Sequence, residues 1–157
     1  MKYARLTREQ FEELHKEFIN FLATQSITAS EWEEIKISKP QVAEEELDVF
    51  SDLVWEGVLD QARFLEHFSP QQIFLFHINE VTINLIGVKV DNTQIDVTTR
   101  EGYTWLQKNL MDDSVSLYTS SKVISDNRNM DVFALIQQGA VITKGDLYQF
   151  FEKHLGL

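Results

Sequence analysis

The sequence has 157 residues, of which 43% are hydrophobic and 25% charged, and its formal net charge is −11 at pH 7. This size and apolar content predict a single globular domain over residues 1–157 with its own core. The negative charge argues against nucleic-acid binding, which depends on Lys and Arg neutralising phosphates. Cysteine is absent, which excludes disulfides, thiolate metal sites and thiol nucleophiles.

The acidic excess lies in the first part of the chain. Residues 1–70 carry 15 acidic and seven basic side chains, whereas residues 71–157 carry ten and seven. A basic partner, or a second copy of the chain, is therefore expected to meet the N-terminal half. The sequence near Met1 has no apolar export segment, and no run approaches 18 apolar residues, so we expect a cytoplasmic protein without a membrane partner.

Capping boxes and apolar periodicity predict three N-terminal helices, at about 7–23, 29–37 and 40–61. In the first, apolar residues recur at spacings of three and four from Phe11 to Leu22, which indicates an amphipathic helix. Each helix begins where a hydroxyl side chain precedes a Glu or Gln by three residues, as a capping box requires: Thr7 and Gln10, Thr28 and Glu31, Ser38 and Gln41.

After Ala62 the apolar period changes from that of a helix to that of a strand. The segment 73–78 is apolar on both faces, 81–90 follows after a turn, and 94–97 comes after Asp91-Asn92. Together these segments predict an antiparallel β-meander at about 72–98.

The remainder of the chain returns mainly to helix. Helices are predicted at about 99–110, 126–138 and 144–155, with Thr98 and Thr143 as N-caps, and a further strand at about 115–119. Helices on both sides of an antiparallel meander predict the α+β class.

Two stretches of the chain resemble a family of small uncharacterised bacterial proteins of similar length. They are FINFLATQSITASEWEEIK at 18–36 and FSDLVWEGVLDQARFLEHFS at 50–69. The likeness covers most of the chain. It implies no activity, ligand or partner, so any site has to be inferred from the residues themselves.

Five carboxylates recur at every fourth residue within the helix predicted at 40–61. This set is called the carboxylate row: Glu44, Asp48, Asp52, Glu56 and Asp60. Like charges at this spacing oppose helix formation by roughly 0.2–0.5 kcal/mol per pair, so four neighbouring pairs cost about 1–2 kcal/mol. Core packing, cations from elsewhere in the chain, or screening by water and salt must offset this cost.

Apolar side chains interrupt the carboxylate row. At about 100° per residue, Trp55, Leu59 and Val49 project among carboxylates that spread over roughly 160°. One interpretation is a docking face, in which the carboxylate row with Trp55 and Leu59 binds a basic protein segment or a second copy of the chain. In the other, Trp55 and Leu59 pack under a neighbouring element, and the carboxylates stay solvated or pair with Lys and Arg.

Glu12 and His15 are the candidate metal ligands. Their Glu-x-x-His spacing places both side chains on one helix face, as in helical carboxylate metal sites. Such sites use two of these steps and two further carboxylates, and the sequence has one step only. His15 also falls within the apolar stripe of its helix, where a core histidine is the ordinary explanation, so we expect no metal.

Glu66, His67 and His77 are the candidate catalytic residues. Glu66 and His67 precede the turn signal Ser69-Pro70 and are expected in a loop, whereas His77 lies in the most apolar predicted strand. An enzyme built on them needs a concave pocket that unites all three. Motifs for phosphate loops, dinucleotides and hydrolase nucleophiles are missing, so we expect no cofactor. A non-catalytic interaction protein needs fewer assumptions than a small enzyme.

Overall fold

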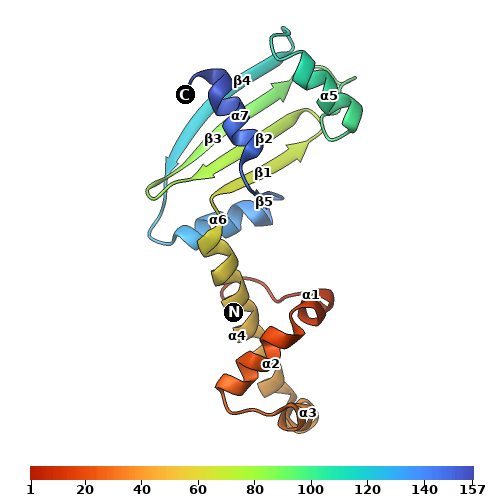
Figure 1. Cartoon of the computed structure of the whole chain (residues 1–157), viewed down its shortest axis with the longest axis vertical. Coiled ribbons are helices and arrows are strands. Elements are labelled where there is room, and N and C mark those ends of the chain that lie inside the picture. The colour runs from red at the N-terminus through yellow and green to blue at the C-terminus, as the bar shows by residue number, and fades with distance from the viewer. The chain divides into compact units, whose positions relative to one another are not determined.

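The computed structural model describes all residues, 1–157, in two compact units, Met1–Asp60 and Gln61–Leu157. The first unit is helical, and the second contains a five-stranded antiparallel sheet with helices (Figure 1). The predicted α+β class, with helices before and after a central meander, is confirmed. That residues 1–157 act as a single domain stays a prediction.

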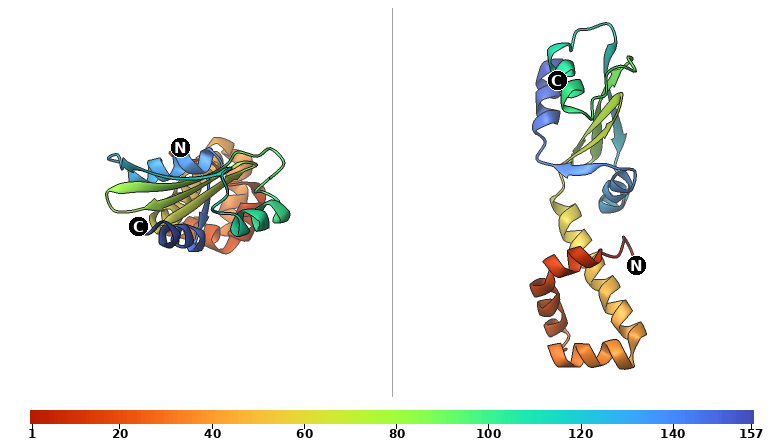
Figure 2. Two further views of the ribbon diagram at one scale, coloured as in Figure 1. Left: turned by 90° about the horizontal axis from the view of Figure 1, so that it is seen from above. Right: turned by 90° about the vertical axis from the view of Figure 1, so that its right-hand side faces the viewer.

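The first unit consists of helices α1 (Arg8–Glu13), α2 (His15–Thr24), α3 (Ala29–Ser38) and α4 (Pro40–Gln61). The right-hand view of Figure 2 shows them arranged as the sides of an open frame. The prediction of one continuous helix over 7–23 was wrong, because Leu14 leaves the helical conformation between α1 and α2. The Leu14 N–H donates to the carbonyls of Gln10 and Glu12. No Gly or Pro marks this break in the sequence.

The predicted caps of these helices hold in two cases out of three. Thr7 forms the complete capping box with Gln10, and the Thr28 hydroxyl accepts from the Glu31 N–H. Ser38 does not cap α4. It lies in the last turn of α3, where its hydroxyl donates to the Glu34 carbonyl.

Aromatic rings form the core of the first unit. The Phe18 ring lies 5.1 Å from that of Phe50 and 5.2 Å from that of Trp32, edge to face in both pairs. This geometry suits the charge distribution of aromatic rings. Phe18 therefore joins α2 to both α3 and α4.

The sheet of the second unit has the order β4-β3-β2-β1-β5, with every neighbouring pair antiparallel. Its strands are β1 (Phe64–Ser69), β2 (Gln72–Ile78), β3 (Thr82–Val90), β4 (Val115–Val123) and β5 (Val141–Thr143). The strand predicted at 115–119 is confirmed and is longer. A third meander strand at 94–97 was wrong: this segment is a turn, and β1 is the third strand, beside β2.

Helices α5 (Arg100–Lys108) and α7 (Asp146–Leu155) cover one face of the sheet, and α6 (Arg128–Gln137) lies on the other side (Figure 2). The cap of α5 is Thr99, one residue after the predicted Thr98. Gly145, in the left-handed region with φ of 89°, precedes α7 in place of Thr143, which belongs to β5. No helix has both the length and the apolar character needed to cross a membrane.

Candidate functional site

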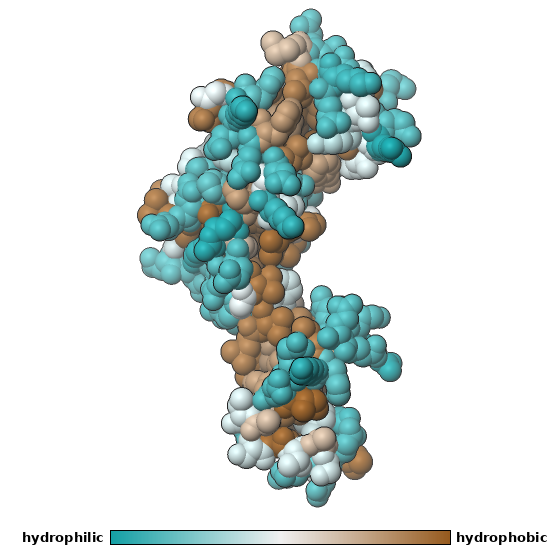
Figure 3. Space-filling model, in the orientation of Figure 1, coloured by the Kyte–Doolittle hydropathy of each residue, from teal (hydrophilic) through white to brown (hydrophobic).

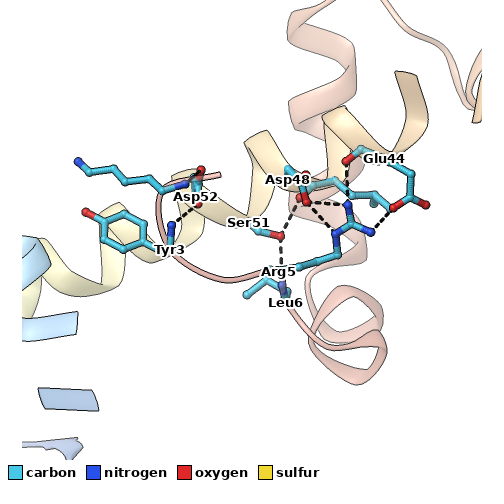
Figure 4. Close-up of polar contacts among 9 residues, drawn as sticks. Tyr3, Arg5, Leu6, Glu44, Asp48, Ser51 and Asp52 are labelled. Carbon is cyan, nitrogen blue, oxygen red and sulfur yellow. Dashed lines mark hydrogen bonds and ion pairs between the residues drawn. The ribbon is translucent and has the colours of Figure 1, made fainter. Parts of the chain in front are cut away.

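The carboxylate row is covered by an extended stretch of the chain, Lys2–Leu6, here called the N-terminal segment. One carboxylate of α4 binds the backbone of the N-terminal segment: the Asp52 oxygens accept from the Lys2 N–H at 2.7 Å and the Tyr3 N–H at 2.9 Å. Next to Asp52 in the sequence, the fully buried Ser51 accepts from the Leu6 N–H at 3.1 Å through its hydroxyl, which donates to the Leu47 carbonyl. These contacts place the N-terminal segment along α4 (Figure 4).

The cations of the N-terminal segment pair with three further carboxylates of the row. The Arg5 guanidinium binds Asp48, with Nε 2.8 Å and a terminal nitrogen 2.6 Å from its carboxylate, and also pairs with Glu44. Lys2 Nζ lies 2.6 Å from a Glu56 oxygen. Since Arg5 meets the earlier carboxylates and Lys2 the later one, the N-terminal segment runs antiparallel to α4.

Two aromatic side chains complete the contact. The Trp55 indole Nε1 donates to the Ala4 carbonyl at 3.0 Å, and the Tyr3 hydroxyl donates to Glu56. Burial, followed by the hydrogen bond to Glu56, raises the pKa of Tyr3. Helix α4 thus binds backbone groups of the N-terminal segment as well as its charged side chains. Asp52, Ser51 and Trp55 all bind main-chain atoms of the N-terminal segment.

The apolar residues among the carboxylates have three different environments. Leu59 is fully buried, Trp55 is half-buried, and Val49 is exposed. Asp60, the last carboxylate, is also exposed. Leu53, one turn after Val49, exposes 55% of its surface, and apolar surface is visible on the helical unit (Figure 3).

These hydrogen bonds and ion pairs therefore offset much of the like-charge repulsion within the carboxylate row. The repulsion of about 1–2 kcal/mol faces hydrogen bonds to charged acceptors, each with a net contribution of about 1.5–3 kcal/mol. The exposed ion pair of Lys2 with Glu56 adds little, because water and salt screen it. Of the two interpretations of the carboxylate row, the pairing of carboxylates with Lys and Arg is observed, and the bound cations come from the chain itself.

The candidate catalytic residues do not come together. Glu66 and His67 lie in β1 and not in a loop, and their side chains point to opposite faces because strand residues alternate. His77 pairs across the sheet with Phe64, so it shares a face with Glu66, and His67 lies on the other face. The His77 ring stacks on the Phe64 ring at 4.5 Å. A pocket uniting the three side chains is absent from this arrangement.

The candidate metal ligands Glu12 and His15 lie in different helices, α1 and α2. The Glu12 carboxylate accepts from Arg8 Nε at 3.3 Å. No group of three His, Asp or Glu side chains in the structure is placed to hold a metal ion. Both residues instead line a cavity between the helices of the first unit.

Glu66 titrates unusually, because burial, and then the negative charge of Asp146, raises its pKa above the ordinary 4.5. An unfolded chain then loses this proton at a lower pH than the folded one. The stability of the folded state consequently falls as pH rises from about 4.5 through the raised pKa of Glu66.

Glu66→Gln should therefore raise the thermal midpoint at pH 7, since a neutral amide does not lose stability through ionisation. The difference from the unchanged protein should shrink well below pH 4.5, where Glu66 is protonated in both states. Thermal unfolding followed by circular dichroism at the two pH values measures it. A difference of equal size at both values would contradict this cause.

Comparison with known proteins places the chain in a family. The model of the family described as "Family of unknown function (DUF6495)" matches residues 1–156. The chain belongs to this family. The predicted resemblance to a family without known activity is confirmed, and the matched region includes both the N-terminal segment and the carboxylate row. No curated protein and no solved structure matches the chain.

Sequence reasoning found the carboxylate row and missed what binds it. Lys2 and Arg5 were counted as part of the basic total and not as ligands of α4. A signal was available, because an extended chain advances about 3.3 Å per residue and three residues therefore span about 10 Å. Two helical turns, from Asp48 to Glu56, span about 12 Å. The two spacings match closely enough for Arg5 and Lys2 to reach both carboxylates.

Proposed function

We propose that this protein is a non-catalytic interaction module whose carboxylate row binds an extended basic segment of a partner protein. The observation that supports it is the binding of the N-terminal segment to α4. A partner segment would bind α4 through the same kinds of contact. The recognised pattern is a cation, an aromatic residue, a small residue, a second cation and an apolar residue, as in Lys2 to Leu6. A protein without cysteine suits the reducing cytoplasm, where we place this interaction.

The proposal assigns a role to each contact. Asp52 and Ser51 bind backbone N–H groups, which every residue except proline offers, whereas Asp48 and Glu56 select for cations. Backbone contacts supply affinity and charges supply selectivity, as in other modes of peptide recognition. The free chain occupies this site with its own segment, so a partner segment must displace Lys2–Leu6, and the measured affinity is reduced by that competition.

A peptide of residues 1–6 carrying a fluorophore tests this role. It should bind the full chain with Lys2→Ala and Arg5→Ala at least tenfold more tightly than the unchanged chain, because the competing segment is weakened. Fluorescence anisotropy gives both affinities. Binding should weaken when salt screens the exposed charges.

The control chain carries Asp48→Asn and Asp52→Asn in addition, which removes two carboxylates of the row. The proposal requires at least a tenfold loss of peptide affinity in this control. Equal affinity for both chains, or no binding by either, would overturn it. If the unchanged chain forms concentration-dependent dimers and the free peptide dissociates them, the partner is a second copy of the chain.

A further inference from the structure

A cavity of about 580 Å³ lies within the first unit, between α1, α2, α3 and α4. This volume is in the range of small-molecule sites in proteins. Its walls are mostly apolar and come from all four helices and from the N-terminal segment: Leu6, Phe11, Phe18, Ile19, Ala29, Trp32 and Leu47.

Cations gather at this cavity against the charge of the unit. Residues 1–60 carry 14 acidic and six basic side chains. Three of those six, Arg5, Arg8 and Lys36, line the cavity, together with His15 and only two carboxylates, Glu12 and Glu33. Arg5 is already bound by Glu44 and Asp48, so Arg8 and Lys36 are the cations that an anionic ligand would meet.

Two of these cations are available to a ligand. Arg8 pairs with Glu12 at 3.3 Å and Lys36 with Glu33 at 2.9 Å, each within one helix. The Arg8 side chain is 90% exposed and that of Lys36 is 44% exposed. Exposed pairs of this kind contribute little to stability, so an anionic ligand can replace the carboxylate at little cost.

Apolar walls and exposed cations together favour a ligand that has an apolar part and an anionic group. We propose that this cavity binds an amphiphilic anion, with its hydrocarbon chain against Phe18 and Trp32 and its anionic head beside Arg8 and Lys36. A carboxylate and a phosphate head share this chemistry. The site goes beyond the proposed peptide binding, because no residue of the carboxylate row lines the cavity.

Dodecanoate and dodecyl phosphate, both below their micelle concentrations, are the probes. Each should bind the full chain at one saturable site by titration calorimetry. The fluorescence of Trp32, isolated by Trp55→Phe and Trp105→Phe, should change with the same midpoint. Neutral dodecanol should bind at least tenfold more weakly. Dodecanol binding as tightly as dodecanoate, or no saturable binding of either anion, would overturn the proposal.

Matched variants locate the binding. Ala29→Trp fills the cavity from the start of α3 and should reduce dodecanoate affinity at least tenfold, whereas Ala23→Trp, on an exposed part of α2 away from the cavity, should not. Lys36→Gln should weaken dodecanoate but not dodecanol, and Lys39→Gln should weaken neither. Equal effects in either pair would overturn the assignment. Peptide binding to the carboxylate row is measured separately, so one proposal can fail without the other.

Discussion

Gly102→Ala should destabilise the second unit by about 3 kcal/mol, at the upper end of overpacking effects. A Cβ atom at this position of α5 would stand 1.8 Å from the Asp96 carbonyl oxygen and 2.4 Å from its carbon. Contacts this short require the backbone to move. Urea unfolding followed by tryptophan fluorescence measures the loss, because Trp105 lies in the same helix.

The loop before α5 has little freedom to yield. The Asp96 carbonyl accepts from both the Thr99 N–H and the Thr99 hydroxyl, at 3.1 and 2.7 Å. The same hydroxyl accepts from the Gly102 N–H at 3.0 Å. Moving Asp96 away from a new Cβ therefore breaks the cap of α5 as well as the packing around Gly102.

Gly57→Ala provides the matched control. Gly57 lies on the exposed side of α4, and a Cβ atom there meets nothing within 4 Å. Alanine in the interior of a helix is favoured over glycine by roughly 1 kcal/mol, so this variant should be more stable than the unchanged chain. Unchanged stability in Gly102→Ala would show that the Asp96 loop adapts freely.

The same loop explains why the start of α5 was predicted one residue early. Thr98 and Thr99 both have a hydroxyl, and Thr98 also has Glu101 three residues later, which completes the sequence pattern of a capping box. In the structure the Asp96 carboxylate accepts from the Thr98 N–H at 2.9 Å and from its hydroxyl. This local turn engages Thr98, and Thr99 becomes the cap.

The errors in the sheet come from contacts between distant residues. The alternation of Ile95 and Val97 is typical of a strand, yet both residues pack against the core from a turn. Phe64–Ser69 contains Glu66 and His67, which obscured its strand period. Its partners β2 and β5 fix it as a strand, and the β5 pairing joins residues more than seventy positions apart.

The carboxylate row was correctly placed on a helix, and its electrostatic cost was correctly identified, because both depend on residues within α4. What offsets that cost lies 39 to 54 positions away in the sequence. Helical periodicity describes neighbours three or four residues apart and carries no information about Lys2 or Arg5. The net charge of residues 1–70 also gave no sign of these ion pairs, since a net charge does not say which cation lies beside which carboxylate.

Asp48→Asn with Asp52→Asn should release the N-terminal segment from α4. The double variant removes the carboxylates that bind Arg5 and the N–H groups of Lys2 and Tyr3. Hydrogen bonds to charged groups contribute roughly 1.5–3 kcal/mol each, and amides retain part of that. We expect a loss of about 2 kcal/mol, which raises the population of released segment about thirtyfold.

Trypsin measures that population, because it cleaves after Arg5 only when the segment leaves α4, and the rate follows the open fraction when opening is fast. Cleavage of the double variant, followed by mass spectrometry, should be at least tenfold faster than that of the unchanged chain. Glu34→Gln with Glu45→Gln removes two exposed carboxylates outside the row and should leave the rate unchanged. Equal acceleration in both double variants would assign the effect to net charge. Acceleration in the first alone would show that Asp48 and Asp52 hold the segment through the specific contacts that a competing partner must replace.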